Sequence, residues 1–411
     1  MDRLLELVPA PHTRLPITLQ SIAQLFLPPF LFYYVTAVLV LIPGTLYARL
    51  ALLPLTLWSA FRASTKLDFA KQFEDERFIY LNHGLLLMMT TLALRAVVWS
   101  FEFKPYYRLT KSGKPKKQPL PFPEILSDAF DLMFNLRGLR WNWSEGLFIP
   151  KETRPTHSRL QFCWATFKSM VTTMVVFDAM HYAVQQLGPD TFATAEGGSI
   201  YDPSLPLVHR YLLSTLVTFL AGFAVVAGIQ YGYLAITLVG VGILQNDPES
   251  WPPAFDKPWV ATSLNEFWAK RWHQSFRDIF VGVGSKPLHY FLGKPGIVLG
   301  AFLVSGVLHV FGLWGMGRGT EFWTVAGYFL LMGLGIVLEH IYKNITGKRV
   351  QGLVGWIWTL AWVVGWGNLL VDAWFRKGLG GSAFFGAEEF RPVTIMRKVV
   401  GLGLHAIQGS A

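Results

Sequence analysis

About eight apolar runs, most of them long enough to cross a bilayer as a helix, constrain the fold of this 411-residue chain more than any other feature. They lie at approximately 22–42, 45–61, 79–99, 161–187, 211–244, 296–316, 322–342 and 353–375. A spanning helix needs about 20 apolar residues, and in lipid it satisfies every backbone hydrogen bond within itself. The sequence therefore predicts an all-α, polytopic membrane protein with about eight transmembrane helices.

The run at 211–244 contains more than thirty residues, too many for one straight crossing. Either it forms a strongly tilted helix, or it is broken near Gly228–Gly232. The sequence leaves both alternatives open.

Composition narrows the class further. Hydrophobic residues make up 52% of the chain and charged residues only 15%, with a net charge of +10. The cations lie in loops between spans, where they set topology and face anionic headgroups, so we expect no nucleic-acid partner. They can also attract a phosphorylated molecule from the cytosol.

The cysteine and histidine content gives no sign of a disulfide or a metal site. A single cysteine, Cys163, excludes an internal disulfide, and no histidine box indicates a metal site.

The runs divide the chain into four segments. Residues 1–100 are expected to hold the N-terminal transmembrane helices, and residues 101–160 a basic cytosolic loop. Residues 161–375 form the expected transmembrane core, including a second cytosolic loop at 245–290. Residues 376–411 form a tail whose placement is open. We expect both long loops to carry amphipathic helices. The first run follows Arg14 without a small-residue cleavage site, so we expect it to remain as a span.

The second loop contains the unusual string SLNEFWAKRWHQSFRDIF, Ser263–Phe280. Ser263 and Glu266 have the spacing of a capping box and predict a helix start. At 3.6 residues per turn an apolar and a charged stripe are expected on this helix. The apolar stripe contains Trp268, Trp272, Phe276 and Ile279, and the charged stripe Glu266, Lys270, His273 and Arg277. Periodicity alone favours a positively charged interfacial anchor.

The first loop contains a comparable string, RGLRWNW, Arg137–Trp143. Two tryptophans beside two arginines suit an interfacial aromatic anchor with snorkelling cations. They suit a ligand-facing surface equally well.

His309 is the leading candidate for chemistry, because it lies about a dozen residues into its span. An ionisable side chain at that depth usually faces a cavity or a partner. Ser305, Gly306 and Gly312 share its face, which leaves room for a substrate or for a close-packed helix. The structural alternative is a neutral imidazole bonded to a neighbouring helix.

Other polar residues within spans are less informative. Asp178 and His181 lie three apart on one face and could form an ion pair or orient a ring. His83 has no predicted partner. There is no GxSxG elbow, and Cys163 has no histidine nearby in sequence. Acyl chemistry here would therefore be direct attack of an acceptor on a bound donor, with a histidine as base.

The strings RGLRWNW, SLNEFWAKRWHQSFR and SGVLH, in this order between apolar spans, resemble the wax-synthase-like branch of the membrane-bound O-acyltransferase superfamily. Within it they most resemble fungal enzymes that acetylate hydroxyls of terpenoid and meroterpenoid secondary metabolites. The resemblance covers the chain from about Pro119 to Asp372.

The resemblance implies that His309 is the catalytic base. Residue 273 occupies the position of an Asn in many members. The resemblance therefore leaves open whether His273 transfers a proton or only orients a hydrogen bond. Ala269 and Lys270 stand where Gly and Arg are commoner. The further residues expected to bind or orient the donor are Lys270, Arg271, Arg277, Trp268, Trp272, Gln274, Arg137, Arg140 and Asn142.

The expected reaction is acyl transfer, with acetyl as the expected group, from acyl-CoA to an apolar alcohol that enters from the bilayer. Acyl-CoA acts as a co-substrate, and no permanently bound cofactor is expected. The expected location is the endoplasmic reticulum membrane. The alternatives are a long-chain wax-ester acyltransferase, a transporter with a proton relay through His309 and Asp178, and a membrane scaffold.

Overall fold

The structure, a computed structural model, describes residues 8–116, 120–144 and 146–408, with side chains up to residue 400. Residues 117–119 of the predicted basic loop lie outside this description. Within the described residues the fold is helical, and β-pairing is limited to isolated bridges. The prediction of an all-α polytopic membrane protein is confirmed.

Seven described helices are long and apolar enough to cross a membrane. They are Leu19–Val40, Glu76–Ser100, Arg159–Leu187, Leu207–Ile243, Arg277–Gly315, Phe322–Thr346 and Gly352–Phe375. The predicted run at 45–61 forms helix α4 (Leu46–Lys66), which is not among the seven. It is less apolar because it contains Arg49, Arg62 and Lys66.

The long fifth run is continuous. Helix α8 (Leu207–Leu238) passes through Gly228–Gly232 without a break and ends in a π-helical turn, η6 (Val239–Ile243). Together they contain 37 residues. At 1.5 Å per residue this is about 55 Å, well beyond the roughly 30 Å of a bilayer core. A strongly tilted or protruding helix is therefore the alternative that remains.

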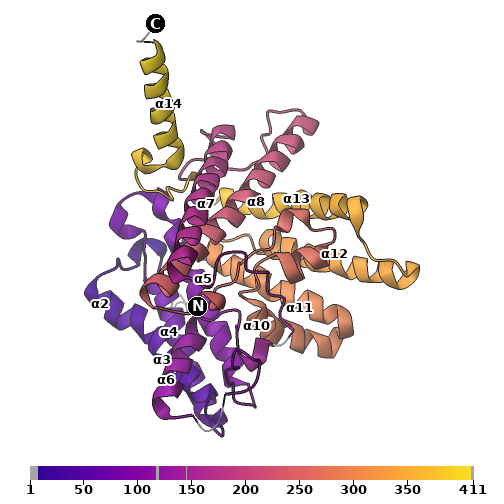
Figure 1. Cartoon of the computed structure of the whole chain (residues 1–411). Coiled ribbons are helices and arrows are strands. Elements are labelled where there is room, and N and C mark those ends of the chain that lie inside the picture. The colour runs from indigo at the N-terminus through magenta and orange to yellow at the C-terminus, as the bar shows by residue number, and fades with distance from the viewer. Residues whose placement is uncertain (1–7, 117–119, 145, 409–411) are drawn as a thin grey trace. The chain divides into compact units, whose positions relative to one another are not determined.

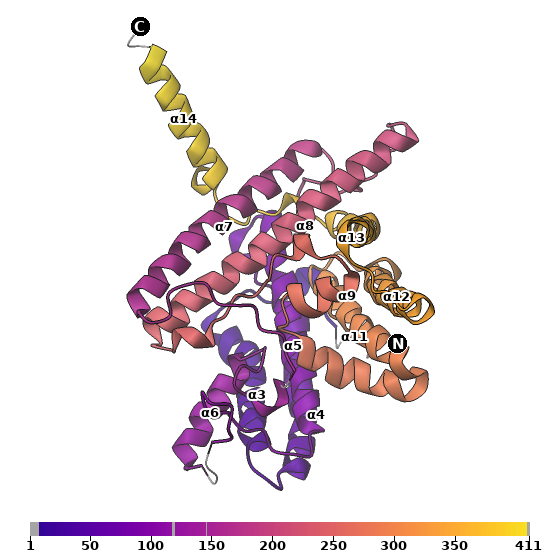
Figure 2. The same ribbon diagram turned by 45° about the vertical axis from the view of Figure 1, so that its right-hand side comes forward.

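The chain forms two compact units, drawn in Figures 1 and 2. Unit 1 contains Met1–Phe148 and Gln274–Gln351, and unit 2 contains Ile149–His273 and Gly352–Ala411. Both units are therefore built from segments that lie far apart in the sequence.

Unit 1 contains α3 (Leu27–Val40), α4, α5 (Tyr80–Ser100) and α6 (Phe122–Phe134). Its later segment contains α10 (Arg277–Ile279), the π-helical turn η10 (Phe280–Ser285), α11 (Lys286–Gly315) and α12 (Phe322–Thr346). Helix α5 packs against α3, α4 and α11, and α11 also packs against α12. Because α5 links the early helices to the later ones, it is the centre of this unit.

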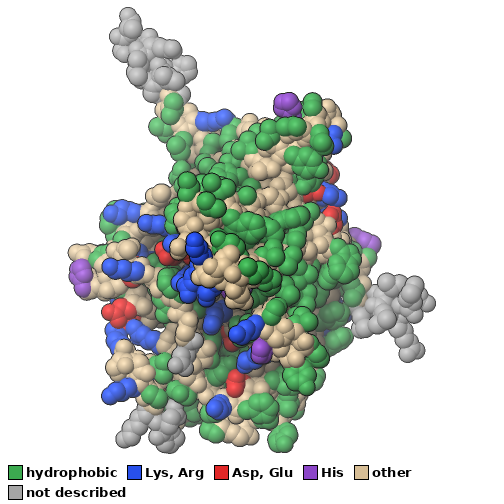
Figure 3. All heavy atoms as spheres, turned by 90° about the vertical axis from the view of Figure 1, so that its right-hand side faces the viewer, with side chains coloured by type: hydrophobic (Ala, Val, Ile, Leu, Met, Phe, Trp, Pro, Cys, Tyr) green, Lys and Arg blue, Asp and Glu red, His purple; other side chains and the backbone are tan. Residues whose placement is uncertain are grey.

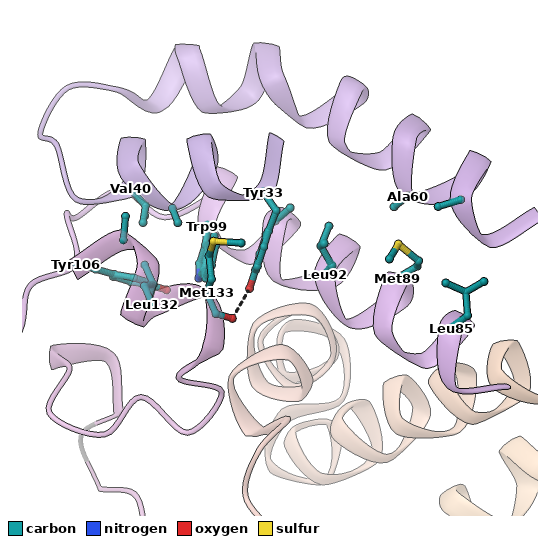
Figure 4. Packing of buried hydrophobic residues seen from close by; sticks show 14 of the residues in the cluster. Tyr33, Val40, Ala60, Leu85, Met89, Leu92, Trp99, Tyr106, Leu132 and Met133 are labelled. Atoms are coloured by element: carbon teal, nitrogen blue, oxygen red, sulfur yellow. Dashed lines mark hydrogen bonds between the residues drawn. The ribbon is translucent and has the colours of Figure 1, made fainter. Parts of the chain in front are cut away.

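The core of unit 1 lies where α3, α5 and α6 meet (Figure 4). Tyr33 and Trp99 stack with ring centroids 4.6 Å apart, and the Tyr33 hydroxyl donates to the Met133 carbonyl. Arg95, only 1% exposed, lies over Trp99 at 4.7 Å and donates to the same carbonyl. These contacts fasten α6, the helix of the first long loop, to the transmembrane helices.

Unit 2 is built on α7 (Arg159–Leu187) and α8, which run side by side in Figures 1 and 2. Helix α13 (Gly352–Phe375) packs against α8. The unit also contains α9 (Leu264–Glu266) and the π-helical turn η9 (Phe267–Arg271). Helix α14 (Pro392–Gln408) leaves the unit after a contact with α7.

Asp178 and His181 have structural partners in unit 2. The fully buried Asp178 carboxylate accepts a hydrogen bond from Arg391 Nε at 2.8 Å and one from the Val393 N–H at 2.8 Å, and Arg391 Nη2 completes the ion pair at 2.8 Å. His181 Nε2 lies 3.2 Å from the Gly380 carbonyl oxygen, which can only accept. Both residues therefore hold the C-terminal segment against α7, and no ion pair forms between them.

Exposed apolar side chains are frequent on the long helices, as expected where helices contact lipid. On the face drawn in Figure 3, hydrophobic side chains form continuous areas, while Lys and Arg side chains gather elsewhere on that face. This separation suits a protein with both lipid-facing and water-facing surfaces.

Candidate active site

The predicted helix start at Ser263 is confirmed. The Ser263 hydroxyl accepts the backbone N–H of Glu266 at 3.0 Å. The Glu266 carboxylate accepts the Thr262 N–H at 2.8 Å and the Thr262 hydroxyl at 3.0 Å. Its return bond therefore reaches one residue earlier than in a standard capping box.

The prediction of one amphipathic helix over Ser263–Phe280 is wrong. The helix of α9 and η9 ends at Trp272, whose backbone is extended (φ −77°, ψ 150°), and a helix restarts only at α10. The Trp272 ring stacks on Phe267 at 5.4 Å and meets Phe255 edge-on at 5.2 Å. This aromatic packing outweighs helical periodicity, so the two predicted stripes do not form.

Arg271 joins the end of η9 to the loop before α9. Its Nε donates to Glu266 at 2.8 Å, and its Nη1 donates to the Asp256 carbonyl at 2.9 Å. Partial burial of Glu266 opposes ionisation, but hydrogen bonds from Thr262 and Arg271 outweigh it and lower the pKa of Glu266. Arg271 therefore has a structural task beside the predicted binding of donor phosphates.

His273 is the last residue of unit 2 before the chain enters unit 1. Its ring meets Phe255 edge-on at 5.5 Å and lies 5.7 Å from the Trp272 ring. Trp268 extends the same aromatic cluster, 5.2 Å from Trp272. Lys270 is exposed. Five predicted site residues therefore lie on this short segment of unit 2: Trp268, Trp272 and His273 in the cluster, Arg271 bonded to Glu266, and Lys270 open to solvent.

A second group of predicted residues lines a pocket of about 50 Å³ within unit 1. Its lining is Leu136, Arg137, Trp143, Ser144, Leu147, Gln274, Arg277, Asp278 and Val281. The two unusual strings of the sequence thus meet, and three predicted donor-binding residues, Arg137, Gln274 and Arg277, share one cavity. Their role stays a prediction.

The polar groups of this pocket differ in exposure. Arg137 and Gln274 are each only 8% exposed, whereas Arg277 is exposed at the surface. The Asp278 Oδ2 atom and the Trp143 indole N–H are buried, and neither has a hydrogen-bond partner among the described residues. The pocket can therefore supply two cations, one carboxylate and one N–H donor to a bound polar group.

Sequence reasoning placed Trp143 only within the RGLRWNW string and did not name Arg95, Ser144 or Asp278 as site residues. Arg95 comes from α5 and lies 5.9 Å from the Trp143 ring, behind the pocket wall. A cation inside an apolar span is a sequence signal that could have marked Arg95. For Ser144 the signal was only its position directly after the first string, and for Asp278 its position inside the second.

Asn142 and Arg140 shape the loop rather than line the pocket. Asn142 Oδ1 accepts the Tyr107 N–H at 3.1 Å, and the Arg140 carbonyl accepts the Leu109 N–H at 2.7 Å. Arg140 has a positive φ of 62°, uncommon for a residue other than glycine. The Asn142 amide holds the loop in place, which weakens the expectation that it orients a thioester.

His309 has a defined hydrogen-bonding arrangement on α11. Its Nδ1 lies 2.7 Å from the Ser305 carbonyl oxygen, one turn earlier. A carbonyl can only accept, so Nδ1 carries the proton and the lone pair of the neutral ring is on Nε2. The ring stacks on Phe329 of α12, with centroids 4.4 Å apart. In this tautomer the neutral ring can accept a proton at Nε2.

The small residues beside His309 accommodate close-packed helices. A Cβ atom at Gly306 would lie 2.9 Å from Ala326 Cα on α12. A Cβ atom at Gly312 would lie 2.9 Å from His83 Cε1 on α5. The sequence left open whether the space beside His309 holds a substrate or a close-packed helix. At Gly306 and Gly312 a neighbouring helix fills it.

The described geometry thus defines a class: a polytopic helical membrane protein with a base-competent histidine in one apolar helix and a small cationic pocket in the same unit. The sequence model of the membrane bound O-acyl transferase family matches residues 251–331, which include both His273 and His309. The chain belongs to the membrane bound O-acyl transferase family.

Three relatives illustrate the family membership. The chain is 31% identical over 273 residues to the acetyltransferase ataH of Aspergillus terreus, covering 59% of this chain and 88% of that protein. It is 29% identical over 170 residues to the acetyltransferase eriL of Hericium erinaceus, covering 38% and 44% respectively. It is 32% identical over 107 residues to a long-chain-alcohol O-fatty-acyltransferase of Simmondsia chinensis, covering 24% and 30%. The matches to the last two span less than half of those relatives.

Proposed function

We propose that this protein is an acyl-CoA-dependent O-acyltransferase that transfers an acetyl group to a hydroxyl of an apolar acceptor, such as a terpenoid or meroterpenoid. The observation that carries the proposal is the Nδ1 contact of His309 with Ser305, which leaves Nε2 as the basic nitrogen. Family membership and the names of several relatives support acyl transfer and the acetyl group. The proposed location is the endoplasmic reticulum membrane.

In the proposed reaction the acceptor hydroxyl gives its proton to His309 Nε2 while its oxygen attacks the thioester carbonyl carbon. The new C–O bond forms and the C–S bond breaks. The proton then passes from Nε2 to the departing thiolate, so no further reactant is needed. General-base catalysis of this kind contributes about 10² to 10⁴ in rate. His273 is proposed to polarise the thioester carbonyl or to orient the donor.

The donor phosphates are proposed to bind at the cationic pocket of unit 1. Exposed Arg277 is available to an anion from water, and buried Arg137 holds a second guanidinium inside the cavity. A volume of about 50 Å³ suits one phosphate group rather than a whole nucleotide. The remainder of the donor would therefore extend beyond this pocket, with Lys270 and Arg271 as further proposed cations.

A long-chain acyl donor is the second candidate, because one relative is named as a long-chain-alcohol O-fatty-acyltransferase. The two candidates differ in the acyl group and in the acceptor, and the same assay separates them. Acetyl-CoA and palmitoyl-CoA are offered in equal amounts to microsomes that contain the protein, with a hydroxylated terpenoid and a long-chain alcohol as acceptors. We expect an acetylated terpenoid as the main product.

The test of the function compares wild type with His309→Ala in the same microsomes, using radiolabelled acetyl-CoA. His340→Ala is the matched control, because His340 is exposed at the far end of α12. We expect loss of product in His309→Ala and normal product in the control, at equal protein levels. Full activity of His309→Ala would remove the base from the mechanism.

A further inference from the structure

His83 of α5 lies against α11 at Gly312, three residues after the proposed base. A Cβ atom at Gly312 would be 2.9 Å from His83 Cε1 and 3.1 Å from His83 Nε2. Gly312 follows His309 by three residues, so both positions lie on one side of the helix. The His83 ring therefore packs on the α11 backbone at Gly312, with Nε2 as one of the ring atoms nearest to this position.

The placement of His83 follows from close packing of α5 on α11. The neighbouring Asn82 is 2% exposed, and its side chain accepts the Phe69 N–H and donates to Asp68, each at 2.7 Å. A Cβ atom at Gly315 would lie 2.7 Å from the Asn82 carbonyl oxygen. Gly312 and Gly315, three residues apart, thus let the start of α5 approach the backbone of α11.

The chemistry of the His83 ring follows from its partner. If a ring nitrogen bonds to the Gly312 carbonyl, that nitrogen must donate. A neutral imidazole then has its lone pair on the other nitrogen, where it can accept a hydrogen bond or stabilise a nearby cation. Such a ring suits a neighbour that becomes positively charged during a reaction.

We propose that His83 is a positioning residue for His309, a neutral second imidazole that stabilises the His309 imidazolium formed when the acceptor hydroxyl loses its proton. The proposal rests on the proposed function. No proton is gained or lost by His83 in the cycle: the proton goes from the hydroxyl to His309 Nε2 and then to the thiolate. His83 touches neither substrate, and its contribution is electrostatic.

The kinetic test uses His83→Gln and His83→Phe in microsomes with acetyl-CoA and the terpenoid acceptor. Gln retains an N–H donor for the Gly312 carbonyl, and Phe retains only the ring shape. We expect both variants to lower kcat by about tenfold or more with little change in the KM of either substrate. The control is Gly84→Ala on the same helix, where a Cβ atom meets nothing within 4 Å; it should retain wild-type kcat. Wild-type kcat in both His83 variants would overturn the proposal.

A second measurement does not depend on activity. Protein with ¹⁵N-labelled histidine in nanodiscs is studied by solid-state NMR, and the His309 signals are assigned by their loss in His309→Gln. We expect His83→Gln to shift the His309 signals, and Gly84→Ala to leave them unchanged. An unshifted His309 spectrum would overturn the pairing. Absence of acyl transfer in wild type would contradict the proposed function but leave the NMR result to decide the pairing.

Discussion

The Ser305 carbonyl oxygen lies 2.7 Å from His309 Nδ1, one turn earlier on the same helix. This contact fixes the tautomer of an imidazole that also stacks on Phe329. It defines which nitrogen can accept a proton, and the following predictions concern the groups that hold this ring and the proposed donor site.

The contact between α5 and α11 should be sensitive to one methyl group. Gly312→Ala would place a Cβ atom 2.9 Å from His83 Cε1, so the ring or the helix must shift. We expect a loss of about 1 to 3 kcal/mol in stability and reduced acyl transfer. Thermal unfolding in detergent and the microsomal assay measure the two effects. Gly327→Ala, whose Cβ meets nothing within 4 Å, should change neither.

Arg137 and Arg140 form a matched pair for the donor site, because only Arg137 lines the pocket. Loss of a buried charge-assisted hydrogen bond to phosphate should raise the acyl-CoA KM of Arg137→Ala roughly tenfold. The catalytic step should change less. Steady-state kinetics at varied acyl-CoA concentration measure this. Equal KM values for Arg137→Ala and Arg140→Ala would argue against phosphate binding in the pocket.

Glu266 should contribute a pH-dependent term to stability. Its folded pKa is lowered below the usual value of 4.5, through hydrogen bonds from Thr262 and Arg271 that outweigh its partial burial. A carboxyl with a depressed folded pKa contributes stability that is present above the unfolded pKa and is lost as pH falls through the folded pKa. We expect the difference in melting temperature between wild type and Glu266→Gln to be larger at pH 6 than at pH 3. A difference that does not depend on pH would contradict this assignment.

The buried Asp178–Arg391 pair should hold the C-terminal segment on α7. Asp178→Ala would leave the Arg391 guanidinium without its buried carboxylate, with Gln185 and the exposed Glu388 still in contact, and the Val393 N–H without its acceptor. Breaking such a pair costs about 3 to 5 kcal/mol. We expect a lower melting temperature and faster proteolytic cleavage near residue 391. Exposed Asp190→Ala serves as the control and should behave like wild type.

Local signals in the sequence were sufficient for much of the fold. Apolar run lengths predicted the spanning helices, and Ser263 predicted a helix start, because both depend on nearby residues alone. The end of that helix at Trp272 could not be predicted, since it depends on packing against Phe255 and on the contact of Arg271 with Asp256. These partners lie 15 or more residues earlier in the same loop, beyond the reach of helical periodicity.

The same distinction applies to the candidate site. His309 and the two Trp-rich strings could be singled out from sequence, and Gly312 indicated space beside His309 for either a substrate or a close-packed helix. The neighbour that fills this space, His83, lies more than 200 residues away in the sequence. The meeting of Arg137 with Arg277 in one pocket likewise depends on how α5, α6 and α10 pack. The relation between His309 and His273 stays a prediction, because they belong to different units.

The central claim is that His309 Nε2 takes the acceptor proton while other groups bind the donor. The most direct measurement is single-turnover acetyl transfer by purified protein in nanodiscs, with acetyl-CoA binding measured on the same samples. For His309→Gln we predict a rate lower by about 10² to 10⁴ and unchanged acetyl-CoA affinity. A His309→Gln rate equal to that of wild type would contradict the account.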